Sequence, residues 1–181
     1  MPMIKSVLEE ASLGVVMLDL IAVTTGPGSF TGLRTGLAAA RGLALAGGIP
    51  LLGVTSFEAA AETARGEAGR RPLVVALESK REELFLQCFD DAGPGKPALV
   101  APAAWCGFVP RTAFVLAGDG AQRLAAALGR ADATIAPAAG PVDAAIVARL
   151  GGARWRPGTR PAPPAPLYLR APDTTQPVRP S

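Results

Sequence analysis

The residues best placed for chemistry lie in one glycine-rich turn, where the hydroxyls of Ser29 and Thr31 precede the guanidinium of Arg34. The turn follows an apolar, β-branched run and leads into an alanine- and leucine-rich stretch, which predicts a strand, a tight turn and a helix. Ser29 and Thr31 are both good N-cap residues. The first N–H groups of a helix have no intrahelical partner and attract negative charge. The turn is therefore a candidate site of close backbone approach to another group.

Arg34 stands where the helix dipole disfavours a cation, because it falls in the first turn of the predicted helix. We therefore expect Arg34 to have an anionic partner. A carboxylate of this chain, a bound anion and an acidic residue of another protein are the three alternatives.

Two well-known phosphate-binding loops do not fit the turn. A Walker A loop needs a lysine after its last glycine, and Leu33 follows Gly32 here. A dinucleotide-binding fingerprint has the spacing GxGxxG, whereas Gly26, Gly28 and Gly32 give GxGxxxG. A tight strand-to-helix turn without any ligand is the alternative interpretation.

The composition bounds the class of protein. With 49% apolar and 18% charged residues, the 181-residue chain is typical of a globular protein with one domain or two small lobes. No apolar run reaches the roughly 18 residues of a membrane span, and the amphipathic first segment does not resemble a signal sequence, so we expect a cytoplasmic protein without membrane contact. The chain has no histidine, and Cys88 and Cys106 lack metal-ligand spacing. We predict no metal site and two buried, apolar thiols.

The positive charge is concentrated at the C-terminal end. From Arg149 onward there are six arginines and eight prolines, with Asp173 as the single acidic residue. A basic, extended segment of this kind suits RNA phosphates. Solvated charge on a surface segment is the interpretation we favour, because no aromatic side chains alternate with the arginines.

Hydrophobic periodicity predicts an α/β chain. We expect the residues around Glu78, Glu82 and Glu83 to form the solvated tip of a hairpin, and Ser56 to cap the third helix. The predicted helices cover residues 2–12, 31–46, 56–65, 122–128 and 142–150, and the predicted strands cover residues 20–25, 51–55, 73–77, 84–89 and 113–117.

The second predicted helix carries small residues at every fourth position, namely Gly32, Gly36, Ala40 and Ala44. Each glycine costs a helix about 1 kcal/mol relative to alanine, so close approach of another backbone must offset that cost. One interpretation is tight packing on the chain's own sheet. The other is that this face, together with the first helix, receives helices of a partner subunit.

Several segments in order along the chain resemble the TsaB (YeaZ) family. The resemblance runs from residue 1 to about residue 173, with Glu78, Ser79 and Lys80 standing where the family usually has Asp-Ala-Arg. The matching segments are GPGSFTGLRTGL at residues 26–37, IPLLGVTS at 49–56, VALESKREELF at 75–85, LAGDGA at 116–121 and PLYLR at 166–170.

The resemblance implies an actin/Hsp70/sugar-kinase-like (ribonuclease H-like) fold with two lobes, at residues 1–66 and 67–181. It also implies that the first lobe is incomplete, because family members usually begin with an Asp-Thr strand and two further strands before the helix that starts here at Met1. If those strands are absent, we expect the strand at residues 20–25 to expose an edge and the chain to self-associate.

The family resemblance implies a non-catalytic partner of the TsaD-like catalytic subunit, working with a TsaE-like ATPase. That machinery forms N6-threonylcarbamoyladenosine beside the anticodon of tRNA and uses ATP and threonylcarbamoyl-AMP, with no cofactor assigned to this chain. A homodimer is left open. The implied partner interface comprises Ile4, Leu8, Gly32, Leu33, Gly36, Leu37, Ala40 and Arg41.

The residues themselves supply no catalytic constellation, so we assign no catalytic residue. There is no histidine, no nucleophile elbow and no phosphate loop with a lysine. An enzyme acting alone, either a sugar-kinase-like phosphotransferase or a peptidase, is the alternative function. ATP hydrolysis by the purified chain would favour the phosphotransferase.

Overall fold

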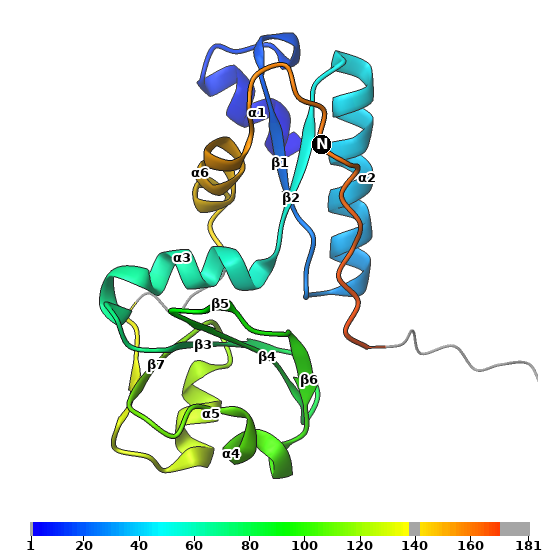
Figure 1. The fold of residues 1–181 in the computed structure, drawn as a ribbon. Coiled ribbons are helices and arrows are strands. Elements are labelled where there is room, and N and C mark those ends of the chain that lie inside the picture. The colour runs from blue at the N-terminus through cyan, green and yellow to red at the C-terminus, as the bar shows by residue number, and fades with distance from the viewer. Residues whose placement is uncertain (1, 138–141, 171–181) are drawn as a thin grey trace, which may run out of the picture.

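The computed structural model describes residues 2–137 and 142–170. The chain forms two sheets, one above the other in Figure 1, with helix α3 lying between them. Its helices are α1 (Pro2–Glu10), α2 (Phe30–Gly47), α3 (Ser56–Ala68), α4 (Trp105–Phe108), α5 (Ala121–Leu128) and α6 (Ala144–Arg154), with 3-10 turns η1 (Val15–Met17) and η2 (Pro102–Ala104). Its strands are β1 (Ile21–Thr24), β2 (Leu51–Val54), β3 (Leu73–Glu78), β4 (Leu84–Asp90), β5 (Gly93–Pro94), β6 (Ala98–Val100), β7 (Phe114–Ala117) and β8 (Ala133–Ile135).

The first sheet consists of β1 and β2, which pair in parallel with Ile21 opposite Leu51. Figure 1 shows these two strands between α2 and α6. Helix α6 approaches β1 closely, because a Cβ atom at Gly151 would lie 2.6 Å from the Cβ of Ala22. The parallel connection between the strands is α2, as the alternation of strand and helix predicts.

The second sheet has the strand order β5-β4-β3-β7-β8, with β6 paired to the first residues of β4, Leu84 to Leu86. Strands β3 and β4 form the predicted antiparallel hairpin, and β7 lies parallel to β3. Alternate residues of β3 face opposite sides: Leu73 packs in a cluster with α3, and Val74 packs in a cluster with α4 and α5. Both faces of this sheet are therefore covered, which explains the continuous apolar sequence of β3 and β7.

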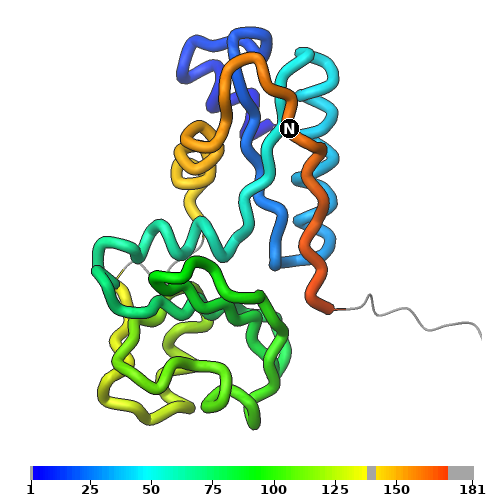
Figure 2. Tube along the Cα trace, in the orientation of Figure 1, coloured from blue at the N-terminus to red at the C-terminus, as the bar shows by residue number. Residues whose placement is uncertain are grey.

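Residues 155–170 form an extended segment, here called the strap, that runs alongside α2 (Figure 2). The Arg41 Nη2 donates a hydrogen bond of 2.7 Å to the carbonyl oxygen of Pro164. The Leu167 N–H donates one of 2.7 Å to the carbonyl oxygen of Thr25. Gly53 allows this approach, because a Cβ there would lie 2.8 Å from the Pro164 Cβ. The strap thus covers the end of the first sheet.

The predicted helices and strands are all present, with ends shifted by a few residues, but several details differ. Thr55, not Ser56, caps α3: its hydroxyl accepts from the Glu58 N–H, and the Glu58 carboxylate accepts from the Thr55 N–H. The last helix begins after Asp143 and extends to Arg154. Prediction missed the short elements β5, β6, β8, α4, η1 and η2.

The chain from Ala144 onward returns to the first sheet, where α6 contacts β1 and β2. A boundary at residue 66 would fall inside α3, which packs on β3 and also contacts α6. The first sheet is thus covered by segments from both ends of the chain. Residue 1, residues 138–141 and residues 171–181 lie outside the described part of the chain, and with them the predictions for Asp173 and Arg179.

Among the described residues, no helix has the length and apolar character needed to cross a bilayer.

Candidate functional site

The glycine-rich turn joins β1 to α2 and is held at both sides. The Ser56 N–H donates a hydrogen bond of 2.8 Å to the carbonyl oxygen of Gly26. Gly26 has a φ of +99°, and a Cβ there would lie 3.3 Å from the carbonyl oxygen of Leu167. Only glycine suits both that conformation and the closeness of the strap. The turn therefore holds the start of α2 in a fixed place beside the strap.

Ser29 is the N-cap of α2, and its hydroxyl accepts a hydrogen bond of 3.4 Å from the Gly32 N–H. Thr31, the other predicted cap, lies within the first turn of the helix and is exposed. The helix starts at Phe30, one residue before the predicted start. The hydroxyls of Ser29 and Thr31 and the exposed Gly28 all face solvent at this end of α2.

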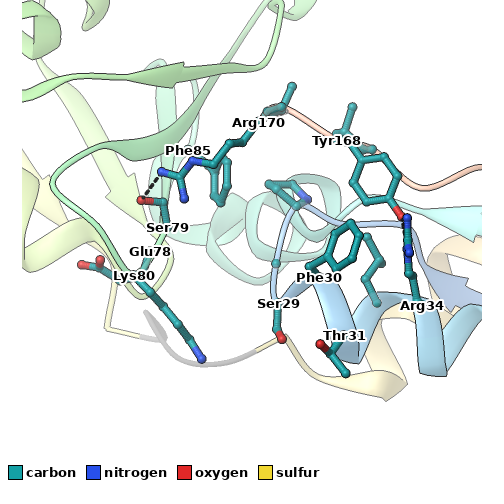
Figure 3. Close-up of a pocket in the computed structure, with 15 residues that line it drawn as sticks. Ser29, Phe30, Thr31, Arg34, Glu78, Ser79, Lys80, Phe85, Tyr168 and Arg170 are labelled. Atoms are coloured by element: carbon teal, nitrogen blue, oxygen red, sulfur yellow. Dashed lines mark hydrogen bonds between the residues drawn. The ribbon is translucent and has the colours of Figure 1, made fainter. Parts of the chain in front are cut away.

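Within this chain, Arg34 contacts an aromatic ring and a phenolic hydroxyl rather than a carboxylate. Its guanidinium carbon lies 3.9 Å from the centre of the Phe30 ring, and its Nε donates a hydrogen bond of 3.0 Å to the Tyr168 hydroxyl (Figure 3). The expectation of a carboxylate partner within this chain is wrong for the described residues. The electron-rich face of Phe30 attracts the cation and offsets the unfavourable helix dipole.

The turn forms one wall of a cleft with a volume of about 660 Å³. The other walls are the β3–β4 hairpin tip and the end of the strap, so the cleft lies between the two sheets (Figure 3). The residues that line it are Pro27, Gly28, Ser29, Phe30, Thr31, Leu33, Arg34, Glu78, Ser79, Lys80, Phe85, Leu167, Tyr168, Leu169 and Arg170.

The carboxylates of the hairpin tip are paired with arginines. Glu78 forms a 3.0 Å ion pair with Arg123, and Glu83 forms a 3.0 Å ion pair with Arg170. Arg170 also donates a hydrogen bond of 3.3 Å to the hydroxyl of Ser79. These contacts tie the strap to the hairpin, so Glu78 and Glu83 are bound within the protein rather than solvated as expected.

Lys80 lies at the hairpin tip with a φ of +61°. The left-handed conformation is uncommon for a lysine and costs about 1 kcal/mol. Figure 3 shows its side chain extending along the rim of the cleft. Among residues 2–137 and 142–170, no hydrogen bond or ion pair holds its ammonium group.

A second hollow lies between α1 and the later part of α2. It has a volume of about 590 Å³ and is mostly apolar, with Ile4 and Leu8 on one side and Leu43 on the other. Helix α1 has no buried residue, although its sequence is amphipathic. Met3 is 79% exposed and Val7 is 58% exposed. The apolar side of α1 is therefore open in this chain.

The small residues of α2 do not form one continuous groove. A step of four residues advances about 40° around a helix, so the row from Gly32 to Ala44 turns through about 120°. Ala40 and Ala44 are buried, whereas a Cβ at Gly36 would meet no atom within 4 Å. The Ala40–Ala44 end of the row thus packs inside this chain, and the Gly36 end is open, so binding of a partner helix there stays a prediction.

The remaining predicted interface residues of α2 have different surroundings. Leu37 is buried on the chain's own core, and Leu33 lines the cleft. Arg41 is exposed, with its guanidinium bonded to the strap. Residues spaced as on one helix face, namely Gly32, Gly36, Ala39 and Leu43, lead from the open glycines to the α1 hollow.

Prediction from the sequence did not single out several residues of these two surfaces, among them Phe30, Leu43, Leu167 and Tyr168. Leu43 could have been found, because it follows Gly36 by seven residues and so shares its face. Phe30 stands inside the glycine motif as its only aromatic residue. For Tyr168 and Leu167, which come from a distant segment, the sequence gives no local signal.

The thiols are also placed differently from the expectation. Cys88 is half-buried, and Cys106 is exposed. Burial, with a smaller effect of the nearby Asp90 charge, raises the pKa of the Cys88 thiol to about 11. Among the described residues, no three potential metal ligands lie together.

The two-sheet α/β fold is that of YeaZ structures. The crystal structure of an uncharacterized Pseudomonas aeruginosa protein with similarity to peptidase YeaZ superposes with a TM-score of 0.76 at 25% identity, covering 93% of this chain and 82% of that one. A structure of YeaZ from Pseudomonas aeruginosa gives a TM-score of 0.71 at 26% identity, covering 85% and 74%.

The chain also has relatives in sequence. An uncharacterized Mycobacterium tuberculosis protein is 34% identical over 172 residues, covering 95% of this chain and 74% of its own length. The tRNA threonylcarbamoyladenosine biosynthesis protein TsaB of Haemophilus influenzae is 33% identical over 85 residues, covering 47% of this chain and 36% of its own length.

The family described as "TsaD: tRNA N6-adenosine threonylcarbamoyltransferase" matches residues 1–100. The chain belongs to this family and is a TsaB-like protein.

Proposed function

We propose that this chain acts in the formation of N6-threonylcarbamoyladenosine in tRNA, as a non-catalytic subunit that binds a TsaD-like catalytic partner. The names of its TsaB relatives and of its family support the pathway. A TsaE-like ATPase completes the assembly that we propose. In that assembly ATP and threonylcarbamoyl-AMP are used by the complex, in the cytoplasm, rather than held by this chain.

The observation that carries the partner role is the unburied helix α1. All of its described side chains are at least partly exposed, including the apolar Met3, Ile4 and Val7. Apolar side chains aligned on one helix face gain free energy when a second surface removes them from water, at about 25 cal/mol per Å². A helical partner face provides such a surface.

The open face of α2 extends the same surface. Glycine at position 36 serves no packing need inside this chain, because a Cβ there would have free space around it. Its cost to the helix is offset if a partner backbone lies against it. We therefore propose an interface of Ile4, Leu8, Gly32 and Gly36, with Leu43 between the helices. Leu37 and Ala40 support it from the core side.

A structural role also suits the carboxylates of the hairpin tip. A general acid or base needs a carboxylate that can reach substrate, whereas Glu78 and Glu83 each form a 3.0 Å ion pair with an arginine of this chain. The chain contains no histidine that could replace them. We further propose an actin/Hsp70/sugar-kinase-like arrangement, with one lobe built on each sheet and α6 and the strap belonging to the first.

The test is capture of a TsaD-like partner by the Gly36→Leu variant. A Cβ at this position meets no atom within 4 Å, and leucine has a better helix propensity than glycine, so we expect a melting temperature equal to or above that of the natural chain and at least tenfold weaker capture. Gly66→Leu is the matched control, because Gly66 is also exposed on a helix with no atom near its missing Cβ. Equal capture by both variants would contradict the proposed interface, and self-association of the free chain through α1 would show a homodimer in its place.

A further inference from the structure

We propose that the cleft between the sheets holds an unpaired stretch of RNA, with a base stacked at Phe30 and Tyr168 and a phosphate at Lys80. This inference rests on the proposed function for the identity of the nucleic acid. It goes beyond that function because it gives this subunit its own contact with the RNA substrate.

Two exposed aromatic rings lie close together at the cleft. Phe30 is 45% exposed and Tyr168 is 44% exposed, and their ring centres lie 5.5 Å apart. Both line the cleft, although they come from opposite ends of the chain. Large aromatic side chains gathered at a cleft are the usual platform for unstacked bases, because every base has a π face.

Positively charged side chains also line the cleft. Arg34, Lys80 and Arg170 line it, and Glu78 is the only acidic residue among the described lining residues. Arg123 neutralises Glu78 at 3.0 Å and Glu83 neutralises Arg170 at 3.0 Å, so the positive charge of the lining comes from Lys80 and Arg34. A phosphate backbone gains from such a lining by releasing its counterions.

The two cations lie on opposite sides of the aromatic rings, where the phosphates of an RNA strand could reach them. Lys80 stands on the hairpin side and Arg34 on the α2 side, with the rings between them and the hydroxyls of Ser29 and Thr31 below in Figure 3. Arg34 uses its Nε for Tyr168, which leaves its terminal nitrogens as donors. Phosphates on either side of one stacked base could therefore be contacted together.

The backbone of Lys80 adds a third, independent observation. A lysine in the left-handed region is strained, and such strain is often kept where a side chain has a task. Glycine or asparagine would relieve the strain but remove the cation from the cleft. The volume of about 660 Å³ is in the range of sites for small molecules, so a nucleotide unit fits.

The test measures binding of the full chain to a fluorescent single-stranded RNA decamer by anisotropy, over a range of salt concentrations. We expect Phe30→Leu to weaken binding about tenfold or more, since stacking on one aromatic ring has effects of that size. We expect Lys80→Asn to weaken it severalfold and to lower the salt slope by about 1. Lys96→Asn removes the same charge at an exposed site outside the cleft and should change binding less than twofold.

Other outcomes overturn the inference. They are no binding by the natural chain, equal binding of a duplex of the same sequence, equal loss in Lys80→Asn and Lys96→Asn, and displacement of the RNA by equimolar free AMP or by an acidic peptide. Capture of the TsaD-like partner, measured on the same variants, separates the two proposals. If Phe30→Leu and Gly36→Leu both leave RNA binding unchanged but only Gly36→Leu loses the partner, the RNA inference fails and the proposed function stands.

Discussion

The two sheets of this protein differ in how completely the chain covers them. In the second sheet, all four residues of β7 are buried, and side-chain clusters fill both faces of β3. In the first sheet, all four residues of β1 are partly exposed, and the nearby helix α1 buries nothing. The second sheet therefore satisfies its own packing, whereas the first has apolar surface left over.

This difference suggests that the two sheets have different roles. We propose that the covered sheet supplies most of the stability of the fold and that the open side around α1 and α2 supplies surface for association. The cleft lies at the junction, where the strap ties one part to the other through Arg170 and Glu83. Changes in the covered part should thus alter folding, and changes in the open part should alter binding.

The largest expected effect is in the covered sheet. Phe114 is fully buried, so Phe114→Ala should lower the free energy of unfolding by about 3–5 kcal/mol. Val7→Ala, on the exposed side of α1, should change it by less than about 0.5 kcal/mol. Urea denaturation of both variants measures this. Similar losses of unfolding free energy in the two variants would contradict the difference in packing between the two parts.

A smaller effect separates two glycines on the helices of the first sheet. Gly151→Ala puts a Cβ 2.6 Å from the Ala22 Cβ, so the free energy of unfolding should fall by about 1–3 kcal/mol. Gly36→Ala has open space, so its better helix propensity should raise the free energy of unfolding by about 0.5–1 kcal/mol. Thermal unfolding of the two variants shows whether each substitution raises or lowers the free energy of unfolding. A loss of stability in Gly36→Ala would mean that the Gly36 position is more tightly packed than the structure shows.

The smallest effect concerns Glu58, which links α3 to α6. Burial raises its pKa, but hydrogen bonds from Thr55 and the ion pair with Arg154 outweigh that effect, so the pKa is lowered from 4.5. A lowered carboxyl pKa stabilises the fold above about pH 4.5, and this contribution is lost as the pH falls through the folded-state pKa.

Glu58→Gln keeps the capping geometry and removes the charge. It should cost about 0.5–1 kcal/mol of unfolding free energy at pH 7, and the difference from the natural chain should shrink as the pH falls below 4.5 and the Glu58 carboxylate becomes protonated. Denaturation at several pH values measures this. A difference that stays constant with pH would assign the loss to the hydrogen bonds rather than to the charge.

Local patterns predicted most of the fold, because strands such as β3 and helices such as α2 have strong periodicity and clear end signals. The glycine turn and its cap at Ser29 were also predictable from residue type. The short strands β5 and β8 were not, since a few residues carry too little pattern and depend on a neighbouring strand for pairing.

The site was predictable only in part, because its other walls come from distant segments. The helix dipole predicted an anionic partner for Arg34 but not its neighbours within the chain, Phe30 and Tyr168, which come from the motif itself and from a distant segment. The four-residue spacing in α2 suggested one groove, whereas the drift of that spacing around the helix gives an open end at Gly36 and a buried end at Ala44.

Hydrogen exchange of the full chain, with and without a purified TsaD-like subunit, measures directly whether α1 and the start of α2 form the partner interface. We expect slower exchange in α1 and in the first two turns of α2, with β3 and β7 unchanged because their hydrogen bonds are already buried. Slower exchange confined to the second sheet or to α4 and α5, or no change in α1, would contradict the account.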